Sequence, residues 1–573
     1  MATGASWRCT CWASEDPPGP AGGRRSGLGS VPGQTFSAAM LHTLRSTGGM
    51  LVAPHHLAAQ AGRDVLRDGG NAVEAMVAAA AAIAVVYPHM NAIGGDGFWL
   101  VHEPGQAPRA IDACGRAAAL ADRGFYAGLD AIPARGPQAA LTVAGTVGGW
   151  ARALALAAPW GQALPLQRLL ADAIRHARDG VAVSTSQHQL TAQKLAGLQA
   201  QPGFAETFLV DGAPPPVGHR LRKPALADTL AQLATRGLDD FYRGELAGHL
   251  VAELQRVGSP LRAADLAAQH AAVVTPLAVQ LAGCRVHNLP PPTQGLATLA
   301  ILGLFERFCA AHGVTAADAE GFAHLHGLVE ATKQAFLLRD RVVTDPGRLP
   351  ADPQAQLAPA ALDALAARLD PRRALPWPQP TAPGDTIWMG AIDRDGRAVS
   401  FIQSVYWEFG SGVVLAGSGV TWQNRGCSFS LDPAALNALA PGRKPFHTLN
   451  PSLALFDDGR VMPFGTMGGE GQPQTQAAVF SRYARFGQPL QQAVTAPRWL
   501  LGRTWGDVST TLKLENRFDP ALVQALRDAG HAVELLPEPF SDTMGHAGAL
   551  VRHADGMIEG AVDPRSDGVV AAL

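Results

Sequence analysis

The sequence predicts an α/β protein, of the α+β kind, in which layers of helix cover layers of sheet. Residues 145–370 consist mainly of alanine- and leucine-rich stretches with helical periodicity. The residues after a proline-rich segment instead alternate short strand patterns with turns and glycine clusters. The chain has 573 residues, of which 47% are hydrophobic, so it can build one large core or several ordinary ones. A helical first part followed by a strand-rich second part indicates helices packed on sheets.

The first predicted elements are two helices followed by a strand. A helical block covers residues 55–86 and is broken at Asp68-Gly69-Gly70. Asn71 is expected to cap the second helix, and Glu74, three residues on, completes a capping box. A strand is expected at residues 98–102. Further helices are expected at residues 166–177, 226–234 and 322–339.

A proline-rich approach leads into a predicted hairpin. Prolines recur from Pro371 to Pro383 and keep this segment extended and out of helices and sheet interiors. A strand pattern begins at Thr386, turns at Arg394-Asp395-Gly396 and returns through residues 398–405. The segment 371–385 could alternatively link two domains.

Thr386 is the predicted nucleophile. A threonine that opens a core hairpin directly after a dispensable segment is a place where a chain can cut itself, here between Asp385 and Thr386. The cut would free an α-amine beside a hydroxyl, which is one of the few ways to activate threonine. If residues 394–396 form a three-residue loop, Ser404 lies opposite Thr386, and Tyr406 projects from the same face two residues on. The alternative is that Thr, Ser and Tyr are simply common on strands.

Other segments could bind negative charge. Gly468 and Gly469 follow a strand, and their N–H groups could converge on an oxyanion. An ordinary glycine turn is the alternative, and a phosphate loop is disfavoured because no Lys-Ser or Lys-Thr follows. Asn424-Arg425 and His447-Thr448 place amide, hydroxyl and cationic groups in turns, which form either an anion pocket or a solvated loop. The glycine run at residues 93–97 is expected to be a structural turn.

Composition excludes several classes of partner. The formal net charge of −2 gives no electrostatic case for nucleic acid or an anionic membrane. The longest apolar run, residues 75–86, is too short to span a bilayer. Residues 1–39 lack the apolar core of a secretory signal and are expected to be a disordered extension, with Met40 as the alternative start. The 6 cysteines show no metal-ligand spacing apart from the isolated Cys9-Thr10-Cys11 pair. They indicate reduced thiols and a cytoplasmic protein.

Taken together, several ordered motifs resemble the γ-glutamyltranspeptidase family of N-terminal nucleophile hydrolases. The motifs are residues 69–73, 88–98, 409–413 and 465–469, and the resemblance spreads over roughly residues 48–570. It implies a proenzyme that folds as a four-layer αββα sandwich and cleaves itself before a threonine. The expected products are a large subunit, residues 40–385, and a small subunit, residues 386–573. Residues 371–385 would become a mobile proline-rich tail of the large subunit.

The resemblance also implies roles for individual residues. Thr386 becomes the nucleophile, and Gly468 and Gly469 donate to the oxyanion. Ser404 stands where the family has a threonine that supports the nucleophile. Other positions depart from the family pattern: Tyr406 replaces an asparagine, Arg425 a glutamine, Ser428 an aspartate, His447 and Thr448 a pair of serines, and Cys114 an arginine. Arg116, two residues beyond Cys114, is expected to take over the work of that arginine.

These departures favour a small carboxylate without an amine as the substrate. A γ-glutamyl group presents an α-ammonium that needs a carboxylate partner when desolvated. Ser428 cannot supply that charge, while Arg425 and His447 add positive potential. Further stretches, at residues 385–390, 401–406, 468–476 and 496–500, resemble the branch of the family that contains oxamate amidohydrolase.

The expected reaction is hydrolysis of oxamate to oxalate and ammonia through an acyl-enzyme on Thr386, without metal or organic cofactor. The alternatives are a γ-glutamyl hydrolase or transferase, an acylase acting on a glutaryl-type group, and an uncleaved, silent binding protein. The pair of subunits could in turn form a homo-oligomer.

Overall fold

The computed structural model describes residues 41–161, 163–377, 385–502 and 509–573. The predicted N-terminal extension (residues 1–39), the possible start at Met40 and residues 378–384 of the proline-rich segment lie outside the described residues. Residues 41–573 form one compact unit, so the segment 371–385 does not link two domains.

Two antiparallel seven-stranded sheets organise the described part of the chain. The sheet that contains β10 has the order β21 (Val569–Ala572), β2 (Gly49–Ala53), β10 (Asp385–Asp393), β11 (Ala398–Tyr406), β3 (Asp96–His102), β4 (Arg109–Ala113) and β7 (Ala272–Val274). The sheet that contains β15 has the order β1 (Leu44–Ser46), β20 (Ile558–Val562), β19 (Ala547–Arg552), β15 (Val461–Thr466), β14 (Ser452–Phe456), β9 (Cys284–Asn288) and β8 (Leu277–Leu281).

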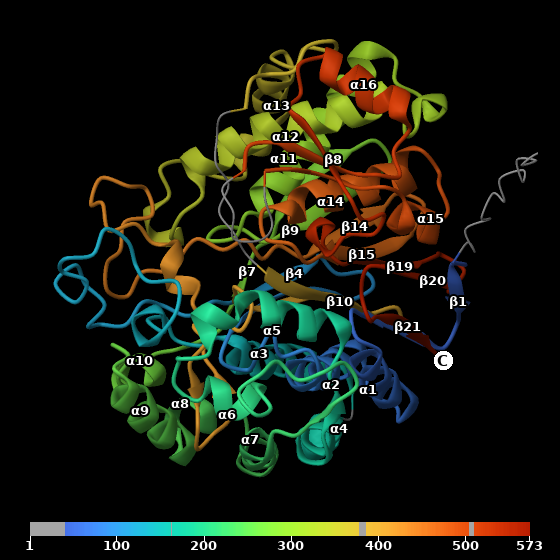
Figure 1. Cartoon of the computed structure of the whole chain (residues 1–573). Helices are drawn as coiled ribbons and strands as arrows, with labels where there is room; N and C mark the ends of the chain where they lie inside the picture. Colours follow the sequence, from blue (N-terminus) through green and yellow to red (C-terminus); the bar gives the residue numbers. More distant parts are fainter. Residues whose placement is uncertain (1–40, 162, 378–384, 503–508) are drawn as a thin grey trace, which may run out of the picture. The chain divides into compact units, whose positions relative to one another are not determined.

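Helices cover the outer face of each sheet. The β15 sheet is covered by α11 (Gly295–His312), α12 (Phe322–Val342) and α14 (Gly471–Phe480). The β10 sheet is covered by α1 (His56–Arg67), α2 (Ala72–Val86) and α3 (Thr146–Ala157), with α4 (Leu166–Asp179) and α7 (Pro224–Arg236) packed beyond α2. Figure 1 shows these two groups of helices on opposite sides of the strands.

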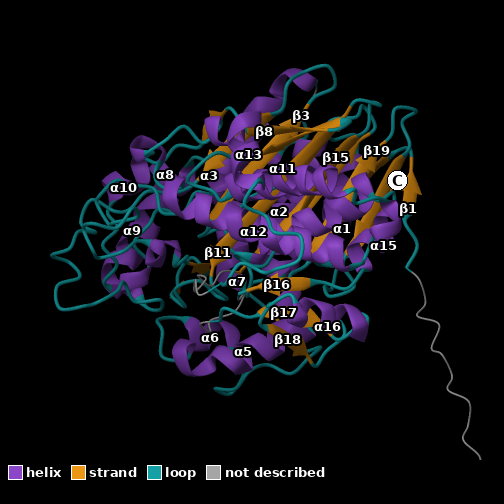
Figure 2. Cartoon of the chain, turned by 90° about the horizontal axis from the view of Figure 1, so that it is seen from above, coloured by secondary structure: helices purple, strands orange, loops and turns teal. Residues whose placement is uncertain are grey.

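The remaining elements are shorter or lie at the margins of the layers. A three-stranded sheet, β16–β17–β18, lies beside α16 (Figure 2). The bounds are α5 (Thr185–Leu198), α6 (Phe204–Phe208), α8 (Asp240–Arg243), α9 (Glu245–Val257), α10 (Ala263–Ala267), α13 (Pro359–Ala366), α15 (Leu490–Thr495), α16 (Pro520–Asp528), β5 (Val181–Ala182), β6 (Arg220–Leu221), β12 (Val414–Leu415), β13 (Val420–Thr421), β16 (Trp499–Leu501), β17 (Leu512–Glu515) and β18 (Val533–Leu536).

Three apolar cores separate the four layers. One core lies between the two sheets and contains Trp388, Ile402 and Leu453. The other two lie between each sheet and its helices. The predicted αββα sandwich is therefore confirmed. The helix α11 is long and apolar enough to cross a membrane by length and composition, but 72% of it is buried inside the protein, as expected for a core helix.

The predicted break between the first two helices is confirmed. Asn71 caps α2, where its side chain accepts from the N–H groups of Val73 and Glu74, and the Glu74 carboxylate accepts from the N–H of Asn71 at 2.9 Å. This reciprocal capping box satisfies backbone donors that the first helical turn leaves without partners.

The predicted hairpin is confirmed as far as Ile387. The Asp393 N–H donates to the Arg397 carbonyl at 3.1 Å across the turn, and the pairing runs without a shift to Ile387 opposite Gln403. The register then shifts between Ile387 and Asp385, which pairs with Tyr406. The predicted register therefore does not extend unchanged to Thr386: at a β-bulge this one residue lies opposite both Ser404 and Val405.

The start of the proline-rich segment is bonded to α12. The Leu375 N–H donates to Glu330 at 3.0 Å, and Lys333 donates to the Leu375 carbonyl at 2.6 Å. Glu330 and Lys333 are themselves a buried ion pair at 2.6 Å. The predicted mobility of residues 371–385 remains untested, but these bonds fasten its described beginning to the large-subunit side of the fold.

Candidate active site

Thr386 lies at the start of β10, one of the central strands of its sheet. Its side chain is buried, and Gln472 in the first turn of α14 donates to its Oγ1 at 3.3 Å. The Gln472 carbonyl oxygen accepts in turn from the backbone and side-chain N–H groups of Asn450, at 3.2 Å each. The predicted nucleophile is therefore positioned by a helix of the opposite αβ half of the sandwich.

Ser404 holds the bulge next to Thr386. Its buried hydroxyl oxygen accepts from the N–H of Tyr406 at 2.8 Å. Tyr406 has a φ of +84°, a backbone conformation that is uncommon for a residue with a bulky side chain. The Ser404 hydroxyl thus stabilises the backbone conformation that ends β11. Its predicted support of the nucleophile itself stays a prediction.

Gly468 and Gly469 form the turn between β15 and α14. Their φ values of +117° and +53° are readily accessible only to glycine. The Gly468 carbonyl accepts from the N–H of Gly471 at 2.8 Å, and the Gly469 carbonyl from the N–H of Gln472 at 3.3 Å. Within the described residues neither glycine N–H has a hydrogen-bond acceptor. The turn thus presents two donors at the positive end of a helix dipole, as an oxyanion site requires.

Arg425 is a buried cation without a described ion-pair partner. It begins a short 3₁₀ helix, Arg425–Ser428, and its guanidinium lies 3.6 Å from the centre of the Tyr406 ring. Its two terminal nitrogens both reach the Thr448 hydroxyl at 3.4 Å, while its Nε has no partner. Burial lowers the pKa of Arg425. Among the described residues no carboxylate forms an ion pair with it, so two-oxygen anions have unused donors to bind.

His447 and Asp96 form a buried pair beside Arg425. His447 Nε2 and Asp96 Oδ2 are 3.0 Å apart, and Asp96 Oδ1 accepts from the N–H groups of Gly115 and Gly145 at 3.0 Å each. Burial raises the pKa of Asp96 to about 6, although the Gly115 N–H and the charge of Arg425 oppose the shift. Burial and then Arg425 hold the pKa of His447 well below its ordinary value. The imidazole is therefore neutral, and its Nδ1 has no described partner.

The other predicted residues are placed differently. Both ends of the Asn424 amide are taken by backbone groups, the N–H of Trp407 and the carbonyl of Ala134, so Asn424 holds its loop in place. Arg116 is exposed and donates to the Gly442 carbonyl at 2.9 Å. No described contact joins Arg116 to Arg425.

A buried thiol completes the cluster around Asp96. Cys114 is fully buried and brings its sulfur within 4.8 Å of ligand atoms of Asp96 and His447. Both signs of charge act on this thiol, negative from Asp96 and Asp112 and positive from Lys444 and Arg425.

Sequence reasoning missed several residues that build the site. Asp96 lies in the glycine run that was expected to be only a structural turn, and its partner His447 is 351 positions away. Gln472 and Asn450 form the support of Thr386 but carry no local sequence signal.

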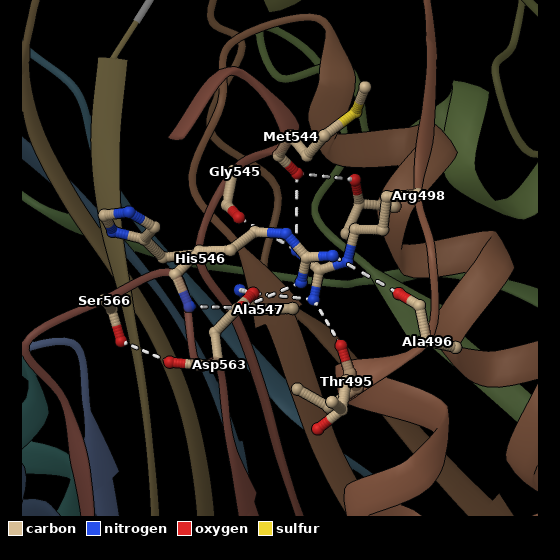
Figure 3. Close-up of polar contacts among 12 residues, drawn as sticks. Thr495, Ala496, Arg498, Met544, Gly545, His546, Ala547, Asp563 and Ser566 are labelled. Carbon is tan, nitrogen blue, oxygen red and sulfur yellow. Dashed lines mark hydrogen bonds and ion pairs between the residues drawn. The ribbon is translucent and has the colours of Figure 1, made fainter. Parts of the chain in front are cut away.

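A buried ionic cluster lies behind the oxyanion turn. Arg498 pairs with Asp563 at 2.6 Å and donates to the carbonyls of Gly545 and Met544, as Figure 3 shows. A Cβ on Gly545 would come within 2.3 Å of the Met467 carbonyl, so residue 545 packs directly on the strand end that carries the two glycines. Arg565 completes the cluster by bonding both Asp563 and Glu515.

Comparisons with known proteins agree with this fold. The profile of the Gamma-glutamyltranspeptidase family matches residues 58–573. An oxamate amidohydrolase proenzyme of Klebsiella pneumoniae subsp. pneumoniae is 57% identical over 527 residues, which cover 92% of this chain and 98% of that protein. A glutathione hydrolase-like proenzyme of Bacillus subtilis is 38% identical over 91% of this chain and 98% of its own length. The solved structure of a cephalosporin acylase from Bacillus halodurans has a TM-score of 0.84 at 32% identity and covers 95% of this chain and 99% of that one. The chain belongs to the γ-glutamyltranspeptidase family.

Proposed function

We propose that this protein is a self-processed amidohydrolase that hydrolyses oxamate to oxalate and ammonia. The observation that carries the proposal is the buried guanidinium of Arg425, which has no described carboxylate partner. The oxamate amidohydrolase proenzyme named above supports the choice of substrate. The two other relatives support the wider reaction class of amide hydrolysis.

Maturation would cut the bond between Asp385 and Thr386. The Thr386 hydroxyl attacks the Asp385 carbonyl, the amide becomes an ester as the nitrogen leaves, and water then hydrolyses the ester. The products are a carboxylate at Asp385 and a free α-amine on Thr386. The buried position of Thr386 beside Gln472 supports this assignment, because the Gln472 amide donates to the hydroxyl oxygen.

Turnover would use the same hydroxyl. The Thr386 amine accepts the proton of its own Oγ1, directly or through a water, while Oγ1 attacks the amide carbon. The N–H groups of Gly468 and Gly469 stabilise the oxyanion, and ammonia leaves with the transferred proton. Water then attacks the oxalyl ester and restores Thr386. Losing one oxyanion donor typically costs about 3 kcal/mol, or on the order of a hundredfold in rate.

Substrate choice would follow from charge. Oxamate is a carboxylate bonded directly to a primary amide, and Arg425 offers paired N–H donors to that carboxylate. A γ-glutamyl substrate would also need a carboxylate for its ammonium. Asp96, the carboxylate that acts on Arg425, is engaged by His447 and two backbone N–H groups, and Asp112, which acts on His447, is paired with Lys444 at 2.6 Å. This occupancy favours an amine-free acid.

A glutaryl-type acylase is the second candidate. A glutaryl group also lacks the amine, and the structural similarity to a cephalosporin acylase favours it. Ammonia release from oxamate, succinamate, glutaramate, glutamine and glutathione separates the candidates. Oxamate should have the highest kcat/KM. Efficient γ-glutamyl transfer to a dipeptide with no ammonia from oxamate would overturn the proposal.

Self-cleavage has an independent test on a denaturing gel. The parent protein should give two bands, with the smaller chain beginning at Thr386 by N-terminal sequencing. Thr386→Ala should give one inactive chain. A parent protein that remains one band under all conditions would support the silent binding protein instead.

A further inference from the structure

We infer that Gln294 is a positioning residue that fixes the oxyanion turn at a set distance from the anion-binding loop. The inference rests on the proposed function, because it assumes that Gly469 donates to the oxyanion and that Arg425 binds the carboxylate. Gln294 is fully buried and directly precedes α11.

The Gln294 amide joins two segments that are distant in sequence. Its Nε2 donates to the Gly469 carbonyl at 2.8 Å and to the Thr448 carbonyl at 2.7 Å, so both of its hydrogens are used. Thr448 is the residue whose hydroxyl contacts the guanidinium of Arg425. A single side chain therefore connects the turn that would stabilise the oxyanion with the loop that would bind the anion.

The remaining polar groups of Gln294 are also engaged. Its side-chain oxygen accepts from Arg339 at 3.1 Å, and its backbone N–H donates to the His447 carbonyl at 2.9 Å. Arg339 also pairs with Glu470 at 3.1 Å, one residue beyond Gly469. Arg339 is buried and stacks on Phe336 with its guanidinium 4.2 Å from the ring centre. The orientation of the amide is thus determined from both ends, which favours a rigid link.

The chemistry of oxamate explains why such a link is needed. Its carboxylate carbon is bonded directly to the amide carbon, so the substrate cannot adjust the distance between its anionic end and its reacting carbonyl. The two binding elements must therefore already have the right separation. A longer, flexible amide can rotate its methylene groups and tolerates some error in that separation.

The test compares Gln294→Met and Gln294→Glu with the parent. Methionine keeps much of the volume but has no N–H, and glutamate keeps the shape but presents oxygen to both carbonyls. Each variant should mature into two chains and lose roughly 10- to 100-fold in kcat on oxamate, because a misplacement of about 1 Å can cost a hundredfold. KM should change less than kcat, since Arg425 remains. The loss should be smaller on glutaramate than on oxamate.

Gln491→Met is the matched control. Gln491 is also buried, and its amide donates to the Thr495 hydroxyl and the Val562 carbonyl rather than to Gly469 or Thr448. The Gln491→Met variant should have a lower melting temperature than the parent but the same ratio of oxamate to glutaramate activity. If a Gln294 variant does not fold, Arg339→Lys tests the same link, because it removes the planar donor to the Gln294 oxygen while keeping the charge.

The outcomes separate the two proposals. A parent enzyme that releases no ammonia from oxamate overturns the proposed function. A folded, cleaved Gln294→Met variant with parental kcat on the best substrate of the parent overturns the positioning role. Equal losses on oxamate and glutaramate would also contradict it, because they indicate general damage.

Discussion

At the scale of single residues, the proposed choice of substrate depends mainly on the guanidinium of Arg425. It is buried against Tyr406 and Thr448 and its pKa is lowered by that burial. Arg425→Ala should remove a charge-assisted pair with the substrate carboxylate, worth about 1.5–3 kcal/mol. The loss in kcat/KM should be large for oxamate and small for a neutral amide of similar size. Equal losses on both amides would show that Arg425 stabilises the fold and does not bind the substrate carboxylate.

The pair of Asp96 and His447 predicts a pH dependence. Above pH 6 the Asp96 carboxylate accepts the Nε2 hydrogen of His447, which leaves Nδ1 as an acceptor for an N–H of the substrate amide. As the pH falls through about 6, Asp96 gains a proton and can donate to Nε2, so the tautomer of His447 changes. KM for oxamate should therefore rise as the pH falls through this value.

Asp96→Asn distinguishes the change in KM caused by Asp96 from changes caused by other titrating groups. The amide of Asn keeps the oxygen that accepts from Gly115 and Gly145. Its nitrogen, however, donates to His447 Nε2, so the imidazole keeps its hydrogen on Nδ1 at every pH, as it does in the parent at low pH. The variant should have a raised KM at pH 8 and no step near pH 6. A step that persists in the variant would come from another group, such as the Thr386 amine.

The same carboxyl has a consequence for stability. Because its folded pKa, about 6, lies above the unfolded value of about 3.9, the folded state binds the proton more tightly. The contribution of Asp96 to the free energy of unfolding is therefore most favourable below pH 4 and falls as the pH rises through 6. This cost at neutral pH indicates that the buried Asp96 carboxylate is retained for a purpose other than stability.

At the scale of elements, the bulge where β10 begins is the feature that the sequence did not predict. The register of the hairpin was predictable because a three-residue loop and an alternating pattern determine it. The shift at Thr386 depends on the positive φ of Tyr406 and on the Ser404 hydroxyl that accepts from its N–H. No local pattern specifies such a bond. Likewise, the capping box of α2 was predictable, whereas the contact of Asp96 with His447 requires the tertiary fold.

Ser404→Ala should slow maturation or turnover, because the Tyr406 N–H then loses its acceptor and the bulge loses its support. Ser404→Thr keeps the oxygen and should largely preserve both. The measurements are the rate of band conversion on a gel and kcat on oxamate. If Ser404→Ala matures and turns over at the parental rate, the bulge needs no hydroxyl at this position.

At the scale of the whole molecule, buried charges connect the C-terminal strands to the site. Burial alone would raise the pKa of Asp563, but Arg498 and Arg565 lower it to about 2. The folded pKa lies below the unfolded value of about 3.9, so this stabilisation is present above pH 4 and is lost as the pH falls through 2. Asp563→Asn should lower the free energy of unfolding by about 3–5 kcal/mol, because it leaves Arg498 buried without its counter-charge.

Urea unfolding at pH 7 measures this effect, with Thr386→Ala as the background so that one uncut chain unfolds. Arg45→Ala is the control, because Arg45 is 58% exposed and pairs with Glu559 at the surface. Its cost should stay below about 1 kcal/mol. An Asp563 variant as stable as the control would show that the arginines find other partners.

Both sheets interleave strands from either side of the Asp385–Thr386 bond: β2, β3, β4 and β7 stand beside β10, β11 and β21, and β1, β8 and β9 beside β14, β15, β19 and β20. Cutting that bond changes the molecularity of folding. The uncut chain refolds by a first-order process, whereas two separated chains must first meet. After dilution from urea, Thr386→Ala should recover at a rate independent of protein concentration, and the cut enzyme slowly, in a concentration-dependent way and with low yield. Concentration-independent recovery of the cut enzyme would contradict this. The working enzyme is thus a state that its chain reaches once, and its lifetime depends on how slowly it unfolds.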